Sequence, residues 1–460
     1  MSTATQSAYL VTALCFILAL KGLSSPKTAR NGNLIGAFGA AVAVVVTVGQ
    51  RHLGHRPLII GAIVVGAVVA VPAARMVKMT QIPQMVALFN GVGGGAAMLV
   101  ALDEYVRLHR LDSTAAAIAV AFAAIVGSVS FTGSLITFAK LQELMTGRPI
   151  LVPGAQVVTP LVGLGAVGCG IAAVAASSVP LLVICTALSL ALGVLFVLPV
   201  GGADVPVVIS LLNAFTGLTV AASGYVLDNT LLIVAGTLVG ASGTMLTQLM
   251  AHAMGRPITG VLFGAFSGSS TAGSTAEVTS SADRAVRSAG ADDIAILLAY
   301  ARKVAIVPGY GLAVAQAQHT CRELVDLLES RGVQVFYAIH PVAGRMPGHM
   351  NVLLAEANVP YEQLKEMDDA NPEFSSTDVA VVVGANDVVN PAARDSVGSP
   401  IYGMPILNVD EATNVVFMKR SMRPGFAGID NELLYHPKTT LFFGDAKDSL
   451  SKLVAAVKAL

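Results

Sequence analysis

The sequence predicts a polytopic α-helical membrane domain followed by a soluble α/β Rossmann-like domain with a doubly wound parallel sheet. Long apolar stretches follow one another up to about residue 252, and strand-like runs alternate with helix-like runs after about residue 290. Hydrophobic residues make up 54% of the 460 residues and charged residues only 12%, whereas soluble domains carry about 25%. Much of the chain must therefore lie where charge is costly.

Nine apolar stretches are long enough to cross a bilayer, which takes about 20 residues. Between Pro149 and Ala251 the only acidic, basic or histidine residues are Asp204 and Asp228, and a soluble fold could not keep so uncharged a surface hydrated. No basic residue precedes Tyr9, so the first stretch indicates a spanning helix rather than a cleaved signal peptide. The stretches cover residues 8–23, 34–50, 57–74, 82–102, 115–139, 154–176, 179–199, 205–227 and 229–251.

An odd number of spans places the two ends of the chain on opposite sides of the membrane. The connections after odd-numbered spans hold eight Lys and Arg residues, and those after even-numbered spans hold four. Because cytoplasmic connections are richer in these residues, we expect the N-terminus outside and the C-terminal domain in the cytoplasm.

The predicted domains are a membrane domain over 1–260, a flexible linker over 261–290 and a soluble domain over 291–460. The linker is rich in Ser, Thr, Gly and Ala without an apolar period. Asp292 is expected to cap a helix at about 292–302. The net charge of zero indicates no nucleic-acid partner, and four scattered cysteines without a C-x-x-C pair indicate small buried residues rather than a metal site or disulfide.

Strand and helix signals alternate through the soluble domain, as in a parallel doubly wound sheet. Helices are expected at 313–330, at 350–357 and from Asp445 to the end. Strands or apolar runs lie at 304–308, 333–339, 378–384, 404–409, 414–418 and 439–444.

The turn after the first strand is a G-x-G-x-x-x-A variant of the dinucleotide fingerprint. Its glycines would let backbone N–H groups approach a pyrophosphate at a helix N-terminus. A lone G-x-G also suits any tight turn, but its place between a strand and a helix is the context that a nucleotide site requires. The candidate binding residues here are Gly309, Tyr310, Gly311, Leu312, Ala313 and Val314.

Other loops also follow strand ends, where open α/β sheets bind ligands. The second strand ends at His340 with no acid before Glu356, which argues against an NAD ribose contact. Lys419, Arg420 and Ser421 offer two cations and a hydroxyl that suit a 2′-phosphate, although a solvated basic turn is the alternative. The remaining candidates lie in the loops 340–349 and 384–387, which are either binding loops or ordinary connections: His340, Arg345, Gly384, Ala385, Asn386 and Asp387.

These segments together resemble the β subunit of the proton-translocating NAD(P) transhydrogenases. The similar segments span almost the whole chain and are 131–141, 201–218, 308–318, 339–357, 384–393, 418–422 and 441–447. The last of them adds Gly444, Asp445 and Ala446 to the cofactor-binding candidates.

The resemblance implies how the cofactor is held. NADP(H) is expected on the C-terminal domain, in a flipped orientation relative to ordinary Rossmann proteins. Lys419, Arg420 and Ser421 would hold the 2′-phosphate. Tyr310 and its glycines, with Arg345, would lie along the pyrophosphate. Asp387 would lie toward the nicotinamide, as the candidate catalytic residue.

The resemblance also implies the reaction and the partners. Hydride would pass from NADH on a separate domain to NADP⁺ on this one, coupled to proton entry through the membrane helices. Spans, linker and one α/β domain account for all 460 residues, so NAD(H) is expected on a partner α subunit, in one chain or two, with further transmembrane helices. A dimer of αβ units in the bacterial plasma (inner) membrane is expected, with no nucleic acid and no metal.

Polar residues within the apolar spans, or at the end of one in the case of Asp204, are candidates for a proton pathway: Asn90, Ser134, Asp204 and Asn213. Ser134 and Asn213 match polar positions on the proton-linked helices of the family. A hydroxyl that only bonds to a helix carbonyl is the alternative for Ser134. Asp204 is placed either to sense the NADP domain or to act as a helix N-cap.

Asn90 departs from the family, because many members carry a membrane-embedded histidine at this position. None of the eight histidines of this chain lies mid-membrane. Asn cannot titrate, so the group that holds the proton is left open.

Two other functions fit parts of the sequence. A transporter or channel with a regulatory nucleotide domain is one, but the GYG run lies in the soluble half and not in a potassium-channel filter. A membrane-anchored NADP sensor is the other, but nine spans are more than an anchor requires.

Overall fold

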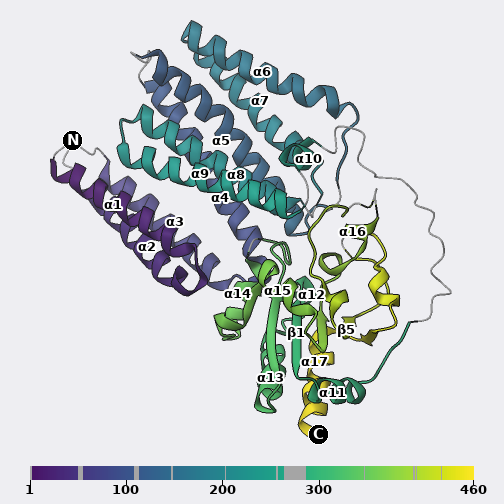
Figure 1. The fold of residues 1–460 in the computed structure, drawn as a ribbon. Coiled ribbons are helices and arrows are strands. Elements are labelled where there is room, and N and C mark those ends of the chain that lie inside the picture. Colours follow the sequence, from purple (N-terminus) through teal and green to yellow (C-terminus); the bar gives the residue numbers. More distant parts are fainter. Residues whose placement is uncertain are drawn as a thin grey trace. The chain divides into compact units, whose positions relative to one another are not determined.

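The computed structural model describes residues 3–49, 55–107, 113–146, 149–201, 204–254, 257–263, 286–346, 348–396, 399, 401–425 and 427–460. The chain divides into two compact units near Gln248 (Figure 1). The first unit is helical, and the second is built on a parallel sheet.

The helices of the first unit are long and apolar. Within the described residues, nine of them have the length and composition to cross a membrane, which confirms a multi-pass membrane unit. The helix α2 begins well before the predicted apolar stretch, at Pro26, which suits the first position of a helix. The nine are α1 (Thr3–Leu23), α2 (Pro26–Val48), α3 (Arg56–Met76), α4 (Ile82–Arg107), α5 (Thr114–Leu141), α6 (Ala155–Ala176), α7 (Val179–Val197), α8 (Val205–Val226) and α9 (Thr230–Ala253).

Helix α5 is the centre of the membrane unit and packs against α4, α6, α7 and α8. Small residues let the backbones approach closely, as is typical between membrane helices. A Cβ atom added at Gly91 would lie 3.1 Å from Ser134 Cβ, and one at Gly94 would lie 3.1 Å from Ser130 Cβ. Helix α3, by contrast, buries none of its residues. Its apolar surface is therefore left for lipid or for another protein.

The second unit contains a six-stranded sheet in which every pairing is parallel. The strand order is β3-β2-β1-β4-β5-β6, so the predicted doubly wound Rossmann-like fold is confirmed. The order reverses between β1 and β4, and the loops that leave these two strands form the topological switch point. The strands are β1 (Lys303–Pro308), β2 (Gln334–Ile339), β3 (Leu364–Glu366), β4 (Val379–Val383), β5 (Asn414–Lys419) and β6 (Thr439–Phe443).

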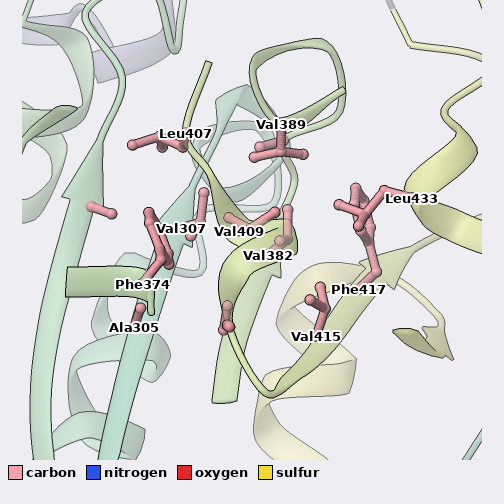
Figure 2. Packing of buried hydrophobic residues seen from close by; sticks show 14 of the residues in the cluster. Ala305, Val307, Phe374, Val382, Val389, Leu407, Val409, Val415, Phe417 and Leu433 are labelled. Carbon is pink, nitrogen blue, oxygen red and sulfur yellow. The ribbon is translucent and has the colours of Figure 1, made fainter. Parts of the chain in front are cut away.

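Both faces of the sheet are covered, which is why its strands read as continuous apolar runs. On one face, Val307, Val382 and Phe417 pack with Phe374 and Leu407 (Figure 2). On the other, the buried Tyr337 lies beside Cys321 of α13. The helices of this unit are α11 (Ala291–Ala299), α12 (Tyr310–Val314), α13 (Gln318–Ser330), α14 (His349–Glu356), α15 (Met367–Phe374), α16 (Ala392–Asp395) and α17 (Ala446–Ala459).

The helix predicted over 313–330 is two helices, α12 and α13. Gln316 has a φ of +50°, and the amide N–H of Ala317 donates to Leu312 O at 3.2 Å, which closes the first helix. The apolar period continues across this break, so the sequence does not reveal it. Strand β3 has only three residues at the sheet edge and gave no apolar signal. The apolar run 404–409 forms no strand; the N–H of Leu407 instead donates to Val388 O.

The start of the soluble unit also differs from the prediction. Helix α11 has Gly290 at its N-cap, so Asp292 lies in the first turn and does not cap it. Ser288 forms a parallel bridge with Leu441 of β6, so the chain already lies along the sheet before α11 begins. Helix α10 (Ile258–Phe263) precedes the stretch 264–285, and that part of the predicted linker lies outside the described residues.

Candidate nucleotide site and membrane polar cluster

The candidate cofactor residues gather at one edge of the sheet. Gly309 follows β1, His340 follows β2, Gly384 follows β4, Arg420 follows β5 and Gly444 follows β6. Because all of these strands are parallel, their carboxyl ends meet at the same edge. The fold thus brings together loops that are far apart in the sequence, at the place where such sheets bind ligands.

The glycines of the fingerprint allow close contact between the loops that follow β1 and β4. The N–H of Gly309 donates to Val383 O, and the N–H of Gly311 donates to Gly384 O, both at 2.9 Å. A Cβ atom at Gly309 would lie 2.4 Å from Gly384 O. Gly384 itself has a φ of +70°, which favours glycine. These two N–H groups therefore already have partners within the chain.

The helix after this turn, α12, is a single turn of five residues. Its dipole is correspondingly small, because a macrodipole needs several aligned peptide units. Leu312 and Ala313 are buried, while Val314 is exposed and Tyr310 is half-buried. Among the candidates of this segment, Tyr310 is the side chain best placed for a ligand.

The β4 and β5 loops are joined by a network around Asn386. Its Nδ2 donates to Asp387 Oδ1 at 2.9 Å, and its Oδ1 accepts from Lys419 Nζ at 3.1 Å. The other carboxylate oxygen of Asp387 accepts from the N–H of Ala427 at 2.8 Å. Gly425 must be glycine here, since a Cβ atom would lie 2.4 Å from both Asn386 Nδ2 and Asp387 Oδ1. The carboxylate of Asp387 is thus held in place by its neighbours.

Lys419 differs in its environment from the two residues that follow it. Its Nζ also donates to Arg423 O at 3.1 Å. Burial lowers the pKa of Lys419, and the charges of Asp387 and Asp430 oppose that shift. Arg420 and Ser421 are exposed. Of the three residues expected at a 2′-phosphate, Lys419 therefore ties two loops together, and Arg420 and Ser421 present their side chains outward.

His340 is enclosed by the chain. Its Nδ1 accepts from the N–H of Val342 at 3.2 Å, so Nε2 carries the proton and donates to Pro405 O at 2.8 Å. Burial lowers the pKa of His340 to about 4, against the opposing effect of the Pro405 carbonyl. Both ring nitrogens are used internally, so the neutral ring shapes the loop after β2.

Arg345 and Tyr310 lie together, with His349 beside them. The Arg345 guanidinium carbon lies 4.5 Å from the centre of the Tyr310 ring. The His349 ring meets the Tyr310 ring edge-on at 6.1 Å, and its Nδ1 accepts from the N–H of Arg345 at 3.1 Å. His349 closes the candidate loop 340–349 but was not among the predicted cofactor-binding residues. Only the fold reveals that it reaches Tyr310.

The last predicted cofactor segment begins helix α17. The N–H of Gly444 donates to Lys419 O at 3.0 Å, and its φ is +155°. Asp445 is the N-cap, and its Oδ1 accepts from the N–H of Lys447 at 3.0 Å. Ala446 is the first residue of the helix. The Asp445 carboxylate thus has a structural partner at the edge of the candidate site.

In the membrane unit, Asn90 and Ser134 belong to a connected polar cluster. Asn90 Nδ2 donates to Ser134 Oγ at 2.9 Å and lies 3.4 Å from Ser130 Oγ. Ser130 Oγ lies 2.6 Å from Thr216 Oγ1. The cluster therefore joins α4, α5 and α8, and Ser130 is a member that the sequence did not single out.

The other two proton-pathway candidates, Asp204 and Asn213, belong to α8, the helix that also holds Thr216 of the cluster. Asn213 is half-buried on α8 and makes no hydrogen bond to the four cluster residues. Asp204 occupies the N-cap position of α8, but its side chain makes no capping hydrogen bond. Along the helix, Asp204 lies roughly 18 Å from Thr216, at about 1.5 Å per residue.

Gln84 and Lys140 are buried polar residues at the end of the α4–α5 pair, and the sequence reasoning missed both as site candidates. Gln84 Nε2 donates to Leu141 O at 3.1 Å. Lys140 Nζ donates to the carbonyls of Val197, Leu198 and Val200 at 3.0, 2.6 and 2.7 Å. Carbonyls at a helix C-terminus attract a cation, so Lys140 fastens α5 to the α7–α8 connection.

The fold defines a multi-pass membrane protein that carries a Rossmann-like soluble unit. Residues 5–456 match the family model described as NAD(P) transhydrogenase beta subunit. Two proteins from Rhodospirillum rubrum, each named NAD(P) transhydrogenase subunit beta, are 45% identical over 460 residues, which is 98% of this chain and 99% of theirs. The chain therefore belongs to the NAD(P) transhydrogenase beta subunit family.

Proposed function

We propose that this chain transfers hydride between NADH and NADP⁺ together with a partner subunit, and that this reaction is coupled to proton translocation across the membrane. The chain supplies the NADP(H) site within 291–460 and part of the proton channel within 1–260. Membership of the transhydrogenase family supports the reaction. The gathering of five polar or glycine-bearing loops at the carboxyl edge of the sheet, which contains the switch point, supports the site.

The residues present at this edge suit NADP(H). Lys419, Arg420 and Ser421 together provide cationic and hydroxyl donors, which a 2′-phosphate dianion requires. The Arg345 guanidinium and Tyr310 lie beside the β1–β4 switch point and suit the pyrophosphate. The N–H groups of Gly309 and Gly311 donate to carbonyls within the chain. Side chains therefore contribute more to pyrophosphate binding in this proposal than in an ordinary dinucleotide fingerprint. When bound, NADP⁺ supplies the hydride acceptor, and Asp387 lies toward it in the proposal.

The NAD(H) site belongs to a partner α subunit in this proposal. The described residues contain one parallel sheet, and its switch point is assigned to NADP(H). The exposed apolar surface of α3 suits contact with further transmembrane helices. The complex is a dimer of αβ units in the bacterial plasma membrane, with the N-terminus outside and the NADP domain in the cytoplasm.

We expect the purified chain alone to transfer no hydride between NADH and NADP⁺, because its described residues contain a single parallel sheet with one switch point. Adding the NAD-binding domain of the partner should restore at least a partial reaction. The measurement is the absorbance of a thio- or acetylpyridine analogue of NADP⁺ during reduction by NADH. Full activity of the chain by itself would contradict the two-subunit proposal.

Arg420→Ala is expected to weaken NADP⁺ binding by roughly 1.5–3 kcal/mol, the range for hydrogen bonds to charged groups. Binding of the 2′-dephospho analogue, NAD⁺, should hardly change. Titration calorimetry of the full chain with both ligands tests this. Exposed Arg331, which lies after α13, provides a matched control as Arg331→Ala. Equal losses for both ligands would assign Arg420 a structural role instead.

A further inference from the structure

His349 has one ring nitrogen in use and one without a partner. Its Nδ1 accepts from the N–H of Arg345, so the proton of the neutral ring lies on Nε2. This Nε2 atom is buried and has no hydrogen-bond partner, and the residue is 2% exposed. An unpaired buried donor is costly to leave unsatisfied, so such a group in a binding loop calls for a ligand.

The surroundings of His349 favour an anionic acceptor. The Arg345 guanidinium and the Tyr310 ring stack beside it. Burial and the nearby charge of Arg345 both lower the pKa of His349, so the ring stays neutral and Nε2 remains a donor. The imidazole N–H of His349 and the guanidinium of Arg345 are both donors that suit phosphate oxygens.

The backbone of the loop fixes this arrangement. Gly344 has a φ of +122°, and a Cβ atom there would lie 2.6 Å from His349 Cβ. The chain therefore turns back on the histidine ring directly before Arg345. This close packing lets one side chain position Arg345 through Nδ1 and present a donor through Nε2.

We propose that His349 is a further cofactor-binding residue, whose Nε2–H donates to a phosphate oxygen of the pyrophosphate of NADP(H). The inference rests on the proposed function, because it deepens the description of the same site. It assigns His349 to the part of the ligand that NADP⁺ and NAD⁺ share, and it leaves the 2′-phosphate to Arg420 and its neighbours.

Two substitutions separate the roles of the two ring nitrogens. In His349→Asn, the side-chain oxygen can replace Nδ1 as the acceptor for Arg345, but the donor at Nε2 is lost. In His349→Gln, the amide can reach the Nε2 position. Calorimetry on the full chain, with NADP⁺ and with 2′-AMP as probes, measures each variant. 2′-AMP carries the 2′-phosphate but has no pyrophosphate.

His349→Asn is expected to bind NADP⁺ roughly 10- to 150-fold more weakly than wild type, as for the loss of a hydrogen bond to a charged group. His349→Gln should bind NADP⁺ more tightly than His349→Asn, and 2′-AMP affinity should stay the same in both. Unchanged NADP⁺ affinity in His349→Asn, a parallel loss of 2′-AMP, or a His349→Gln variant no tighter than His349→Asn would overturn the assignment. Failure of the wild-type chain to bind NADP⁺ would instead refute the proposed function.

Discussion

Asn90→Leu is expected to block or uncouple proton translocation while NADP⁺ affinity stays at the wild-type value. Asn90 bridges α4 and α5 through Ser134, and the cluster continues to Thr216 on α8. Leucine cannot donate or accept, so the cluster would lose its central link and the remaining hydroxyls would be left in an apolar setting. The soluble unit, in which no part of this cluster lies, should bind NADP⁺ as before.

Asn90 cannot titrate, so it can only offer hydrogen bonds to a proton carrier or to water. Either a histidine or acid on a partner helix packs against Asn90, or a water chain lined by Asn90, Ser134 and Asn213 conducts alone. We favour the partner helix, because coupling to NADP needs a group whose protonation can be gated.

Sealed vesicles with an internal pH probe, containing this chain and its partner, provide the measurement. Thr186→Val is the matched control, because the buried Thr186 hydroxyl bonds only to Leu182 O of its own helix. The control should pump protons like wild type. If Asn90→Leu vesicles pump normally as well, Asn90 has no place in the pathway.

The second large effect is a loss of stability in the soluble unit as the pH falls from about 6.5 to about 4. The pKa of His340 drops from 6.5 to about 4 because of burial. In that interval the unfolded chain takes up a proton that the folded chain does not, so acid favours unfolding. At about 1.36 kcal/mol for each pKa unit, this residue alone accounts for roughly 3 kcal/mol, and its effect is absent above pH 6.5.

The measurement is amide hydrogen exchange in the full chain at several pH values. Exchange of strands β1 and β2 reports the stability of the soluble unit separately from that of the membrane unit. His340→Gln removes the titrating ring, so its stability should vary less with pH between 4 and 6.5 than that of wild type. His436→Gln replaces an exposed histidine and should leave the pH profile unchanged. A His340→Gln profile as steep as that of wild type would contradict the role assigned to burial.

The sequence by itself determined the class of each unit. A helix in a bilayer must satisfy every backbone group internally and present apolar side chains to lipid, so composition and length alone identify the spans. Alternating strand and helix signals identify a parallel sheet, because each parallel connection needs a crossover. The long segments similar to the transhydrogenase β subunit likewise identified the family, and the comparison with known proteins confirmed it.

Only the tertiary structure decided which groups of the candidate site already have partners. The N–H groups of Gly309 and Gly311, both nitrogens of His340 and two of the protons of Lys419 are used within the chain. In the membrane unit, only the structure shows that Ser130 lies within hydrogen-bond distance of Asn90. These contacts join residues distant in the sequence, and local periodicity carries no information about such pairs. The structure also shows that His349 Nδ1 has a partner while the buried Nε2 has none, which the sequence could not reveal.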